Sequence, residues 1–141
     1  MTRARSVILD NEAVQALVDP DHRKHRQVVA AVEAVTARTL RRAGSTRLVV
    51  PTAVRVDAGW DRRAPAAAVI NRLPADDASL DRPAADRAAA ARRALDVSVA
   101  DAHLAAVIAS AAGPVAVLTR DVTDVRRIAG YLDADVTVVA L

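Results

Sequence analysis

Four short runs of branched aliphatic residues constrain the fold of this chain most strongly. They span residues 7–9, 48–50, 115–118 and 136–139, and turn residues lie near each of them. Continuous apolar runs of this kind are typical of strands that are buried on both faces, and the segments between them have helical spacing. The alternation predicts an α/β fold, a three-layer α/β/α sandwich with a mostly parallel central sheet. A fifth, weaker strand is predicted near residues 78–80.

Helical segments with recognisable start and stop signals separate the predicted strands. The predicted helices span residues 12–17, 22–42 with Gly44 as a stop, 52–60, a short segment from Pro65, 83–95, 99–112 after a Ser98 cap, and a last helix from Asp121 to Gly130. Apolar residues from Val28 to Val35 in the second helix form a candidate dimerisation face.

Length and composition indicate one globular domain over residues 1–141, because a chain of 141 residues is long enough for one core. Hydrophobic residues make up 52%, and Trp60 and Tyr131 are the only aromatic residues, so the core must consist of Val, Leu, Ile and Ala. The absence of cysteine excludes disulfides and Cys-based zinc sites. No apolar run suggests a membrane span or a signal peptide, so a soluble, cytoplasmic protein is expected.

The charge balance favours an acidic partner such as nucleic acid. The net charge is +3 and the sequence pI is about 10.5. An equally good explanation is a GC-rich genome, because nearly all of the positive charge is arginine and Lys24 is the only lysine. The near absence of aromatic residues argues against a base-stacking platform. The arginine pairs at 41–42 and 62–63 are ordinarily surface charge, with phosphate contact as the alternative.

Carboxylates follow two of the predicted strands. Asp10 ends the first strand, and Asp121 follows the strand over residues 115–118 across Thr119 and Arg120. Open α/β sheets bind their ligands outside the carboxyl ends of the strands. If these two strands are neighbours, the two carboxylates are neighbours as well.

Two further aspartates lie on apolar stripes of predicted helices. Asp101 precedes Leu104 by three residues and Ile108 by seven, so it shares their inward stripe. Asp57 shares a face with Val54 in a shorter helix, where the stripe is less defined. An ionised carboxylate in such a place is costly unless it is paired or binds a cation.

Converging carboxylates point to a divalent metal ion. They repel one another, and proteins keep such clusters ionised by binding a hard cation through oxygen ligands. Mg²⁺ or Mn²⁺ fits better than zinc, because the chain offers no cysteine and no suitably placed histidine. One or two such ions can generate a hydroxide and stabilise the in-line displacement of a phosphodiester.

The same residues also have purely structural interpretations. Asp10 and Asp121 could each cap the helix that follows, and the helix dipole favours any acid at Asp101. His22, His25 and His103 are expected to be solvated or structural. His103 points roughly 200° around its helix from Asp101 and so faces away from it.

The order of these segments resembles a known family. SVILDNEAV, VVPTAVRVDAGW, VSVADAHLAA and VAVLTRDVTDV, in that order and over nearly the whole chain, resemble the PIN-domain family, in particular the VapC-like ribonuclease toxins of toxin–antitoxin pairs. The resemblance implies that the catalytic, metal-binding acids are Asp10, Asp57, Asp101 and Asp121. It also implies a supporting hydroxyl at Thr119 and makes Asp124 a further candidate ligand.

The resemblance further implies an activity and partners. These are Mg²⁺- or Mn²⁺-dependent endonucleolytic cleavage of RNA, for example tRNA or another structured RNA, a homodimer, and an inhibitory antitoxin.

Three positions depart from the family pattern. Asp57 stands where Glu is common, so it would reach the metal only through water. Asn11 stands where a small hydroxyl residue is common, and Arg120 stands where Ser or Asn is more usual.

Two alternative functions stay open at this point. The first is a catalytically degenerate PIN domain that binds RNA or a protein without cutting, and Asp57 and the basic pI support it. The second is a phosphoreceiver-like signalling domain, which also has an acid after its first strand. Against the second, Asp57 is predicted to be helical and no lysine follows a late strand.

Overall fold

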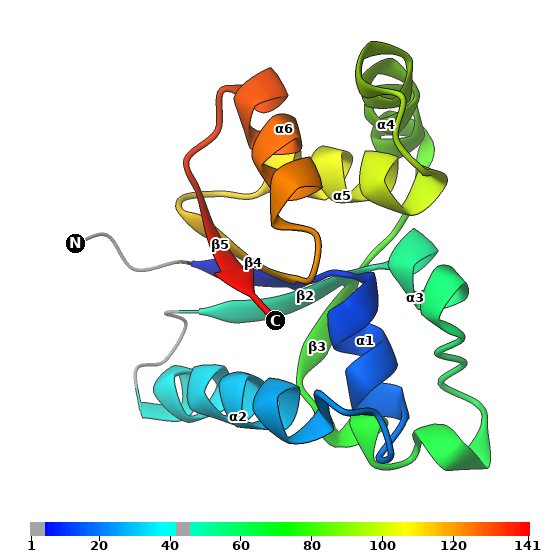
Figure 1. The fold of residues 1–141 in the computed structure, drawn as a ribbon, viewed down its shortest axis with the longest axis vertical. Coiled ribbons are helices and arrows are strands. Elements are labelled where there is room, and N and C mark those ends of the chain that lie inside the picture. The colour runs from blue at the N-terminus through cyan, green and yellow to red at the C-terminus, as the bar shows by residue number, and fades with distance from the viewer. Residues whose placement is uncertain (1–4, 42–45) are drawn as a thin grey trace.

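Five parallel strands form the centre of the computed structural model, which describes residues 5–41 and 46–141. The strands are β1 (Ser6–Leu9), β2 (Arg47–Pro51), β3 (Ala75–Ala78), β4 (Val115–Thr119) and β5 (Val136–Ala140). Their order in the sheet is β3-β2-β1-β4-β5, and every neighbouring pair is parallel. The first strand therefore lies in the middle of the sheet, as Figure 1 shows.

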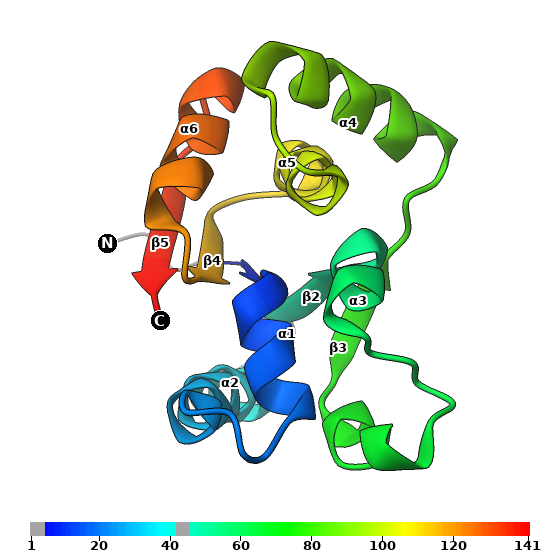
Figure 2. The same cartoon turned by 45° about the vertical axis from the view of Figure 1, so that its right-hand side comes forward.

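Helices cover both faces of this sheet. They are α1 (Asn11–Val18), α2 (His25–Arg41), α3 (Thr52–Ala58), α4 (Arg82–Leu95), α5 (Val99–Ser110) and α6 (Val122–Leu132), with two short 3-10 helices at Pro65–Ala67 and Ile70–Arg72. Helices α1 and α2 lie on one side of the sheet, and α5 and α6 lie on the other (Figure 2). This arrangement confirms the predicted α/β/α sandwich. No helix in the described ranges combines the length and apolar character of a membrane span.

The alternation of side chains along the strands explains why the apolar runs are continuous. Val7 and Leu9 point into the core beneath α1 and α2, whereas Ile8 between them points into the core beneath α5 and α6. Because both faces are covered by helices, every position of such a strand is buried and must be apolar. The same rule holds in β4, where Val117 and Leu118 belong to opposite cores.

Helix α5 is buried on more than the single stripe that its sequence predicts. Leu104 and Ile108 pack toward the sheet, while Ala102 and Ala106 pack against Ala88 of α4. Figure 2 shows α5 end-on between α4 and the sheet. The small alanine side chains let the two helices approach, and α5 therefore lies inside the molecule along most of its length.

Two positional predictions are wrong. The fifth strand lies at Ala75–Ala78 and shares only Ala78 with the predicted segment, because its two central aspartates hide the strand from an apolar pattern. The last helix continues past Gly130 to Leu132 and ends at Asp133, which takes the left-handed conformation with φ 50°. A glycine does not by itself end a helix, and here Asp133 ends α6 instead of Gly130.

The expected dimerisation face on α2 is also wrong. Val28 and Val32 are fully buried in the core, and Val29 and Val35 are partly buried and pack against it. This face of α2 therefore packs against the core of its own chain. The predicted stop at Gly44 lies outside the described residues, as do the side chains of Arg41 and Arg42, for which surface charge was expected and phosphate contact was the alternative.

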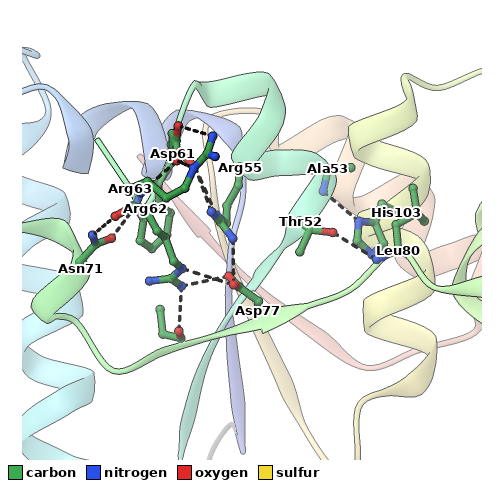
Figure 3. A network of polar contacts seen from close by, with 12 residues as sticks. Thr52, Ala53, Arg55, Asp61, Arg62, Arg63, Asn71, Asp77, Leu80 and His103 are labelled. Carbon is green, nitrogen blue, oxygen red and sulfur yellow. Dashed lines mark hydrogen bonds and ion pairs between the residues drawn. The ribbon is translucent and has the colours of Figure 1, made fainter. Parts of the chain in front are cut away.

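A charged network anchors the edge strand β3 to the segment after α3. Asp77 accepts from Arg55 Nη1 at 2.8 Å and from Arg62 Nη2 at 2.9 Å (Figure 3). The two guanidinium carbons lie 5.4 Å and 4.2 Å from the centre of the Trp60 ring. The indole of Trp60 donates to Asn71 Oδ1 at 3.0 Å. Arg62 is therefore committed to the fold, and it is not a free phosphate contact.

Replacing Asp77 by Ala is expected to lower the free energy of unfolding by about 1–2 kcal/mol, because it leaves two half-buried guanidinium groups without their carboxylate. Urea unfolding measures this loss. Asp76→Ala is the matched control. Its partner Arg47 is 67% exposed, so this pair should contribute about 0.5 kcal/mol or less. Equal losses in the two variants would contradict the role given to the network.

Candidate functional site

The candidate site lies where β1 and β4 end side by side. Leu9 pairs with Leu118 in the sheet, and the backbone N–H of Asp10 donates to the Leu118 carbonyl at 3.1 Å. The hydroxyl of Thr119 donates to Asp10 Oδ2 at 2.7 Å. The first and fourth strands are thus neighbours, and the residues that follow them meet at the carboxyl edge of the sheet.

Asp10 is a buried carboxylate whose two oxygens are both fixed. Its exposed fraction is 6%, and its Oδ1 accepts from the backbone N–H of Asn11 at 2.8 Å. Burial raises the pKa of Asp10, and repulsion from Asp121 and Asp57 adds to this, while hydrogen bonds from Thr119 and Asn11 act in the opposite direction. Asp10 is also the N-cap of α1. The capping role and a ligand role are therefore compatible.

Thr119 links Asp10 to the start of α6. Its hydroxyl oxygen accepts from the backbone N–H of Asp121 at 2.9 Å while its proton goes to Asp10. Asp121 in turn caps α6 by accepting from the backbone N–H of Asp124 at 3.2 Å. The buried hydroxyl therefore orients the loop on which the exposed Asp121 is carried.

The four predicted acids line a single pocket of about 220 Å³ at this edge. Asp10 comes from the end of β1, Asp57 from α3, Asp101 from the first turn of α5 and Asp121 from the loop after β4. Asp124 is not part of this lining and lies 3.4 Å from Arg127. The structure thus brings four of the five acids together and leaves Asp124 at the side.

The environment of Asp101 is the clearest electrostatic sign of crowding. Burial and repulsion from Asp10, Asp124 and Asp121 raise the pKa of Asp101 from 3.8 to about 6. Its backbone N–H donates to the Ser98 hydroxyl at 3.1 Å, which confirms Ser98 as the cap of α5. A carboxylate held next to three others gains from any cation that enters the pocket.

Asp57 differs from the other acids of the pocket in the way it is held. Its side chain is exposed and lies at the rim, so the expected inward direction is wrong. Asp57 Oδ2 accepts from Asn11 Nδ2, and Asn11 Oδ1 accepts from Gln15 Nε2 at 3.0 Å. The amide of Asn11 thus ties the rim carboxylate to α1.

Two charged residues of the pocket were missed by the sequence reasoning as site residues. Glu12 lines the pocket from the first turn of α1, with Oε1 3.5 Å from His22 Nε2. Arg120 lines it too, and within the described part of the chain no carboxylate forms an ion pair with its guanidinium. The available sequence signals were their places next to the predicted acids. Glu12 lies two residues after Asp10, and Arg120 lies directly before Asp121. From the sequence, Arg120 is only a departure from the family pattern.

The lining suits a hard divalent cation that keeps part of its water. In the described residues, no three His, Asp or Glu side chains lie close enough around one point to form a complete metal site. Mg²⁺ commonly binds proteins through one or two carboxylates and several waters. Asp10, with its fixed oxygens, and Asp101, with its raised pKa, fit such a site.

Comparison with known proteins adds no family assignment. No model of a known protein family matches the chain, and no curated protein sequence matches it either. The fold and the pocket alone define its class, which is an open all-parallel α/β sandwich with an acidic pocket at the carboxyl edge of its central strands.

Proposed function

We propose that the protein is a Mg²⁺- or Mn²⁺-dependent endoribonuclease of the VapC-like PIN-domain type. The observation that carries this proposal is the meeting of Asp10, Asp57, Asp101 and Asp121 in one pocket at the ligand-binding edge of the sheet. The raised pKa of Asp101 supports it, because perturbed carboxylates are common at catalytic metal sites. By the same family resemblance we propose a homodimer, an inhibitory antitoxin and a cytoplasmic location.

Each residue has a distinct part in this mechanism. Asp10 and Asp101 would hold the ion, and Thr119 keeps Asp10 oriented through its hydroxyl. When bound, Mg²⁺ or Mn²⁺ supplies activation of water and neutralisation of charge at the phosphodiester. Asp57 lies at the rim and would contact the ion through water. The guanidinium of Arg120, which forms no ion pair with the residues that the structure describes, can bind a phosphate oxygen of the RNA.

The phosphoreceiver interpretation is contradicted by the sheet. Flavodoxin-like sheets of that kind have the strand order 2-1-3-4-5, whereas the order here is 3-2-1-4-5. Asp57 lies in helix α3 and not at a strand end. Asp57 is therefore not placed as the phosphate acceptor of such a domain.

A binding module that does not cut RNA is the second candidate. The exposed position of Asp57 and the incomplete metal geometry favour it. It differs from the first candidate in one measurable property. A degenerate domain would retain RNA or protein binding while showing no metal-dependent cleavage.

Cleavage of a total tRNA and structured RNA pool separates the two candidates. The purified protein is incubated with the pool in Mn²⁺, in Mg²⁺ and in EDTA, and Asp10→Asn purified in the same way controls for contaminating nucleases. Cleavage in Mn²⁺ that disappears in EDTA and in the variant is expected. Equal background from both proteins, with RNA retained on a filter, would favour the binding module.

Asp57→Asn is expected to reduce cleavage by about tenfold, a smaller loss than that of a buried ligand, because Asp57 lies at the exposed rim. Cleavage rates at saturating Mn²⁺ measure it. Asp61→Asn is the control, since Asp61 pairs with the exposed Arg63 away from the pocket. A loss of more than a hundredfold in Asp57→Asn would mean that Asp57 binds the ion directly.

A further inference from the structure

His103 is a fully buried polar residue for which the proposed chemistry has no use. It lies in α5, two residues after Asp101, and its exposed fraction is 0%. Its Nδ1 accepts from the backbone N–H of Ala53 at 3.2 Å, as Figure 3 shows. Its Nε2 has no hydrogen bond of ordinary geometry within the described residues. Burial lowers the pKa of His103, against smaller opposing effects of the Ser79 backbone and Asp81.

Helix α3 lacks an N-terminal cap of its own, and His103 supplies the missing hydrogen-bond acceptor. The N-cap of α3 is Pro51, whose side chain makes no capping hydrogen bond. The first N–H groups of any helix lack a partner within the helix, and that of Ala53 is one of them. His103 therefore does from another helix what Ser or Asp usually does from the N-cap position. Next to it, Thr52 Oγ1 accepts from Leu80 N at 3.1 Å.

The two helices joined by this bond carry two acids of the pocket. Asp101 precedes His103 by two residues in α5. Asp57 lies four residues after Ala53, on the same side of α3. A shift of the start of α3 away from α5 would therefore move Asp57 away from Asp101. The hydrogen bond between Ala53 and His103 joins the two helices that carry these two acids.

We propose that His103 is a positioning residue for the metal site. Its Nδ1 acceptor holds α3 against α5 and so fixes the distance between Asp57 and Asp101. The inference rests on the proposed function, since it concerns the same acids. It also explains a polar side chain among the alanine, valine and leucine residues of α5, where an unpaired nitrogen is costly.

The need for an acceptor at the position of Nδ1 predicts which substitutions of His103 keep the hydrogen bond. Nδ1 must be unprotonated to accept from Ala53, so the neutral ring carries its proton on Nε2. In Asn, the amide oxygen can occupy nearly the place of Nδ1. In Gln the amide lies one bond further out, and Leu offers no acceptor. His103→Asn should therefore preserve the bond, whereas His103→Gln and His103→Leu should remove it.

Titration calorimetry with Mn²⁺ tests the proposal without relying on cleavage. We expect His103→Asn to bind Mn²⁺ within about threefold of the wild type, and His103→Gln and His103→Leu to bind about tenfold more weakly, which is no more than the loss expected when the Asp57 carboxylate itself is removed. His25→Leu is the control, because His25 Nδ1 lies 2.7 Å from the Ala16 carbonyl, in a bridge between α1 and α2. It should leave the affinity unchanged.

Three results would overturn the inference. Wild-type affinity in His103→Leu would show that the acceptor is not needed, and equal weakening in His103→Asn and His103→Leu would assign the residue to packing. A wild type that binds no Mn²⁺ would refute the metal site itself, and the positioning role with it. Hydrogen exchange of the Ala53 amide separates these cases. It should be slow in the wild type and in His103→Asn and faster in His103→Leu, whether or not metal binds.

Discussion

Replacing Asp10 by Asn is expected to reduce RNA cleavage to background, a loss of at least about 100-fold, or about 2.7 kcal/mol of activation free energy. Asp10 is the most buried of the four acids, and both of its oxygens are already fixed by Thr119 and Asn11. Asn keeps the shape but removes the charge that a divalent ion requires. The loss should therefore concern metal affinity and cleavage together.

The fold of this variant should persist, because Asn can still accept from the backbone and a buried charge is removed. Circular dichroism and thermal unfolding in EDTA check this point, and Mn²⁺ titration measures the lost affinity. Thr119→Val provides a graded comparison, since it leaves the carboxylate but removes its orienting hydroxyl. Full cleavage by a folded Asp10→Asn protein would rule out the proposed site.

Metal binding and cleavage are expected to fall by about tenfold for each pH unit below about 6. The pKa of Asp101 is raised to about 6, so the carboxyl is protonated below this pH, and a protonated carboxyl does not bind a cation. The pH profile of cleavage at limiting Mn²⁺ measures this, and saturating Mn²⁺ should shift the midpoint to lower pH. A profile flat between pH 4.5 and 7.5 would contradict it.

The metal-free protein should show the opposite trend in stability. The folded-state pKa of Asp101 lies above its ordinary 3.8, so the folded state binds the proton more tightly than the unfolded state does. The contribution of Asp101 to stability is then greatest below pH 3.8 and is lost as the pH rises to about 6, by about 1 kcal/mol once solvent screening of this half-exposed group is allowed for. Added Mn²⁺ should restore the unfolding temperature above pH 6 and have little effect at pH 4.

The parts of the site that could be predicted from the sequence are those attached to strands. A run of branched apolar residues marks a buried strand, and the polar residue that ends it marks the edge of the sheet, so Asp10 and Asp121 were found directly. Asp101 was found because its helix has apolar residues at regular spacing. The family resemblance pointed to the Thr119 hydroxyl, whereas other neighbours of the acids, such as the Asn11 amide on Asp57, needed three dimensions.

Other features depend on contacts between segments far apart in the sequence. His103 is buried at a side of α5 that meets the start of α3 and the segment around Ser79 and Asp81, and no property of α5 alone predicts that cover. Strand β3 contains two aspartates that are stabilised by arginines from β2, α3 and the loop after it. Local propensity gives no signal for a strand whose stability comes from ion pairs.

The central place of β1 has a consequence for the time at which the pocket can form. β1 lies between β2 and β4, so after it has paired with β2 this strand still waits for a second partner more than 100 residues later. Asp10 gains its Thr119 contact only after β4 has been synthesised. A growing chain therefore carries the first acid of the site without the groups that orient it. The proposed cleavage activity would begin only after β4 and Asp121 have been made.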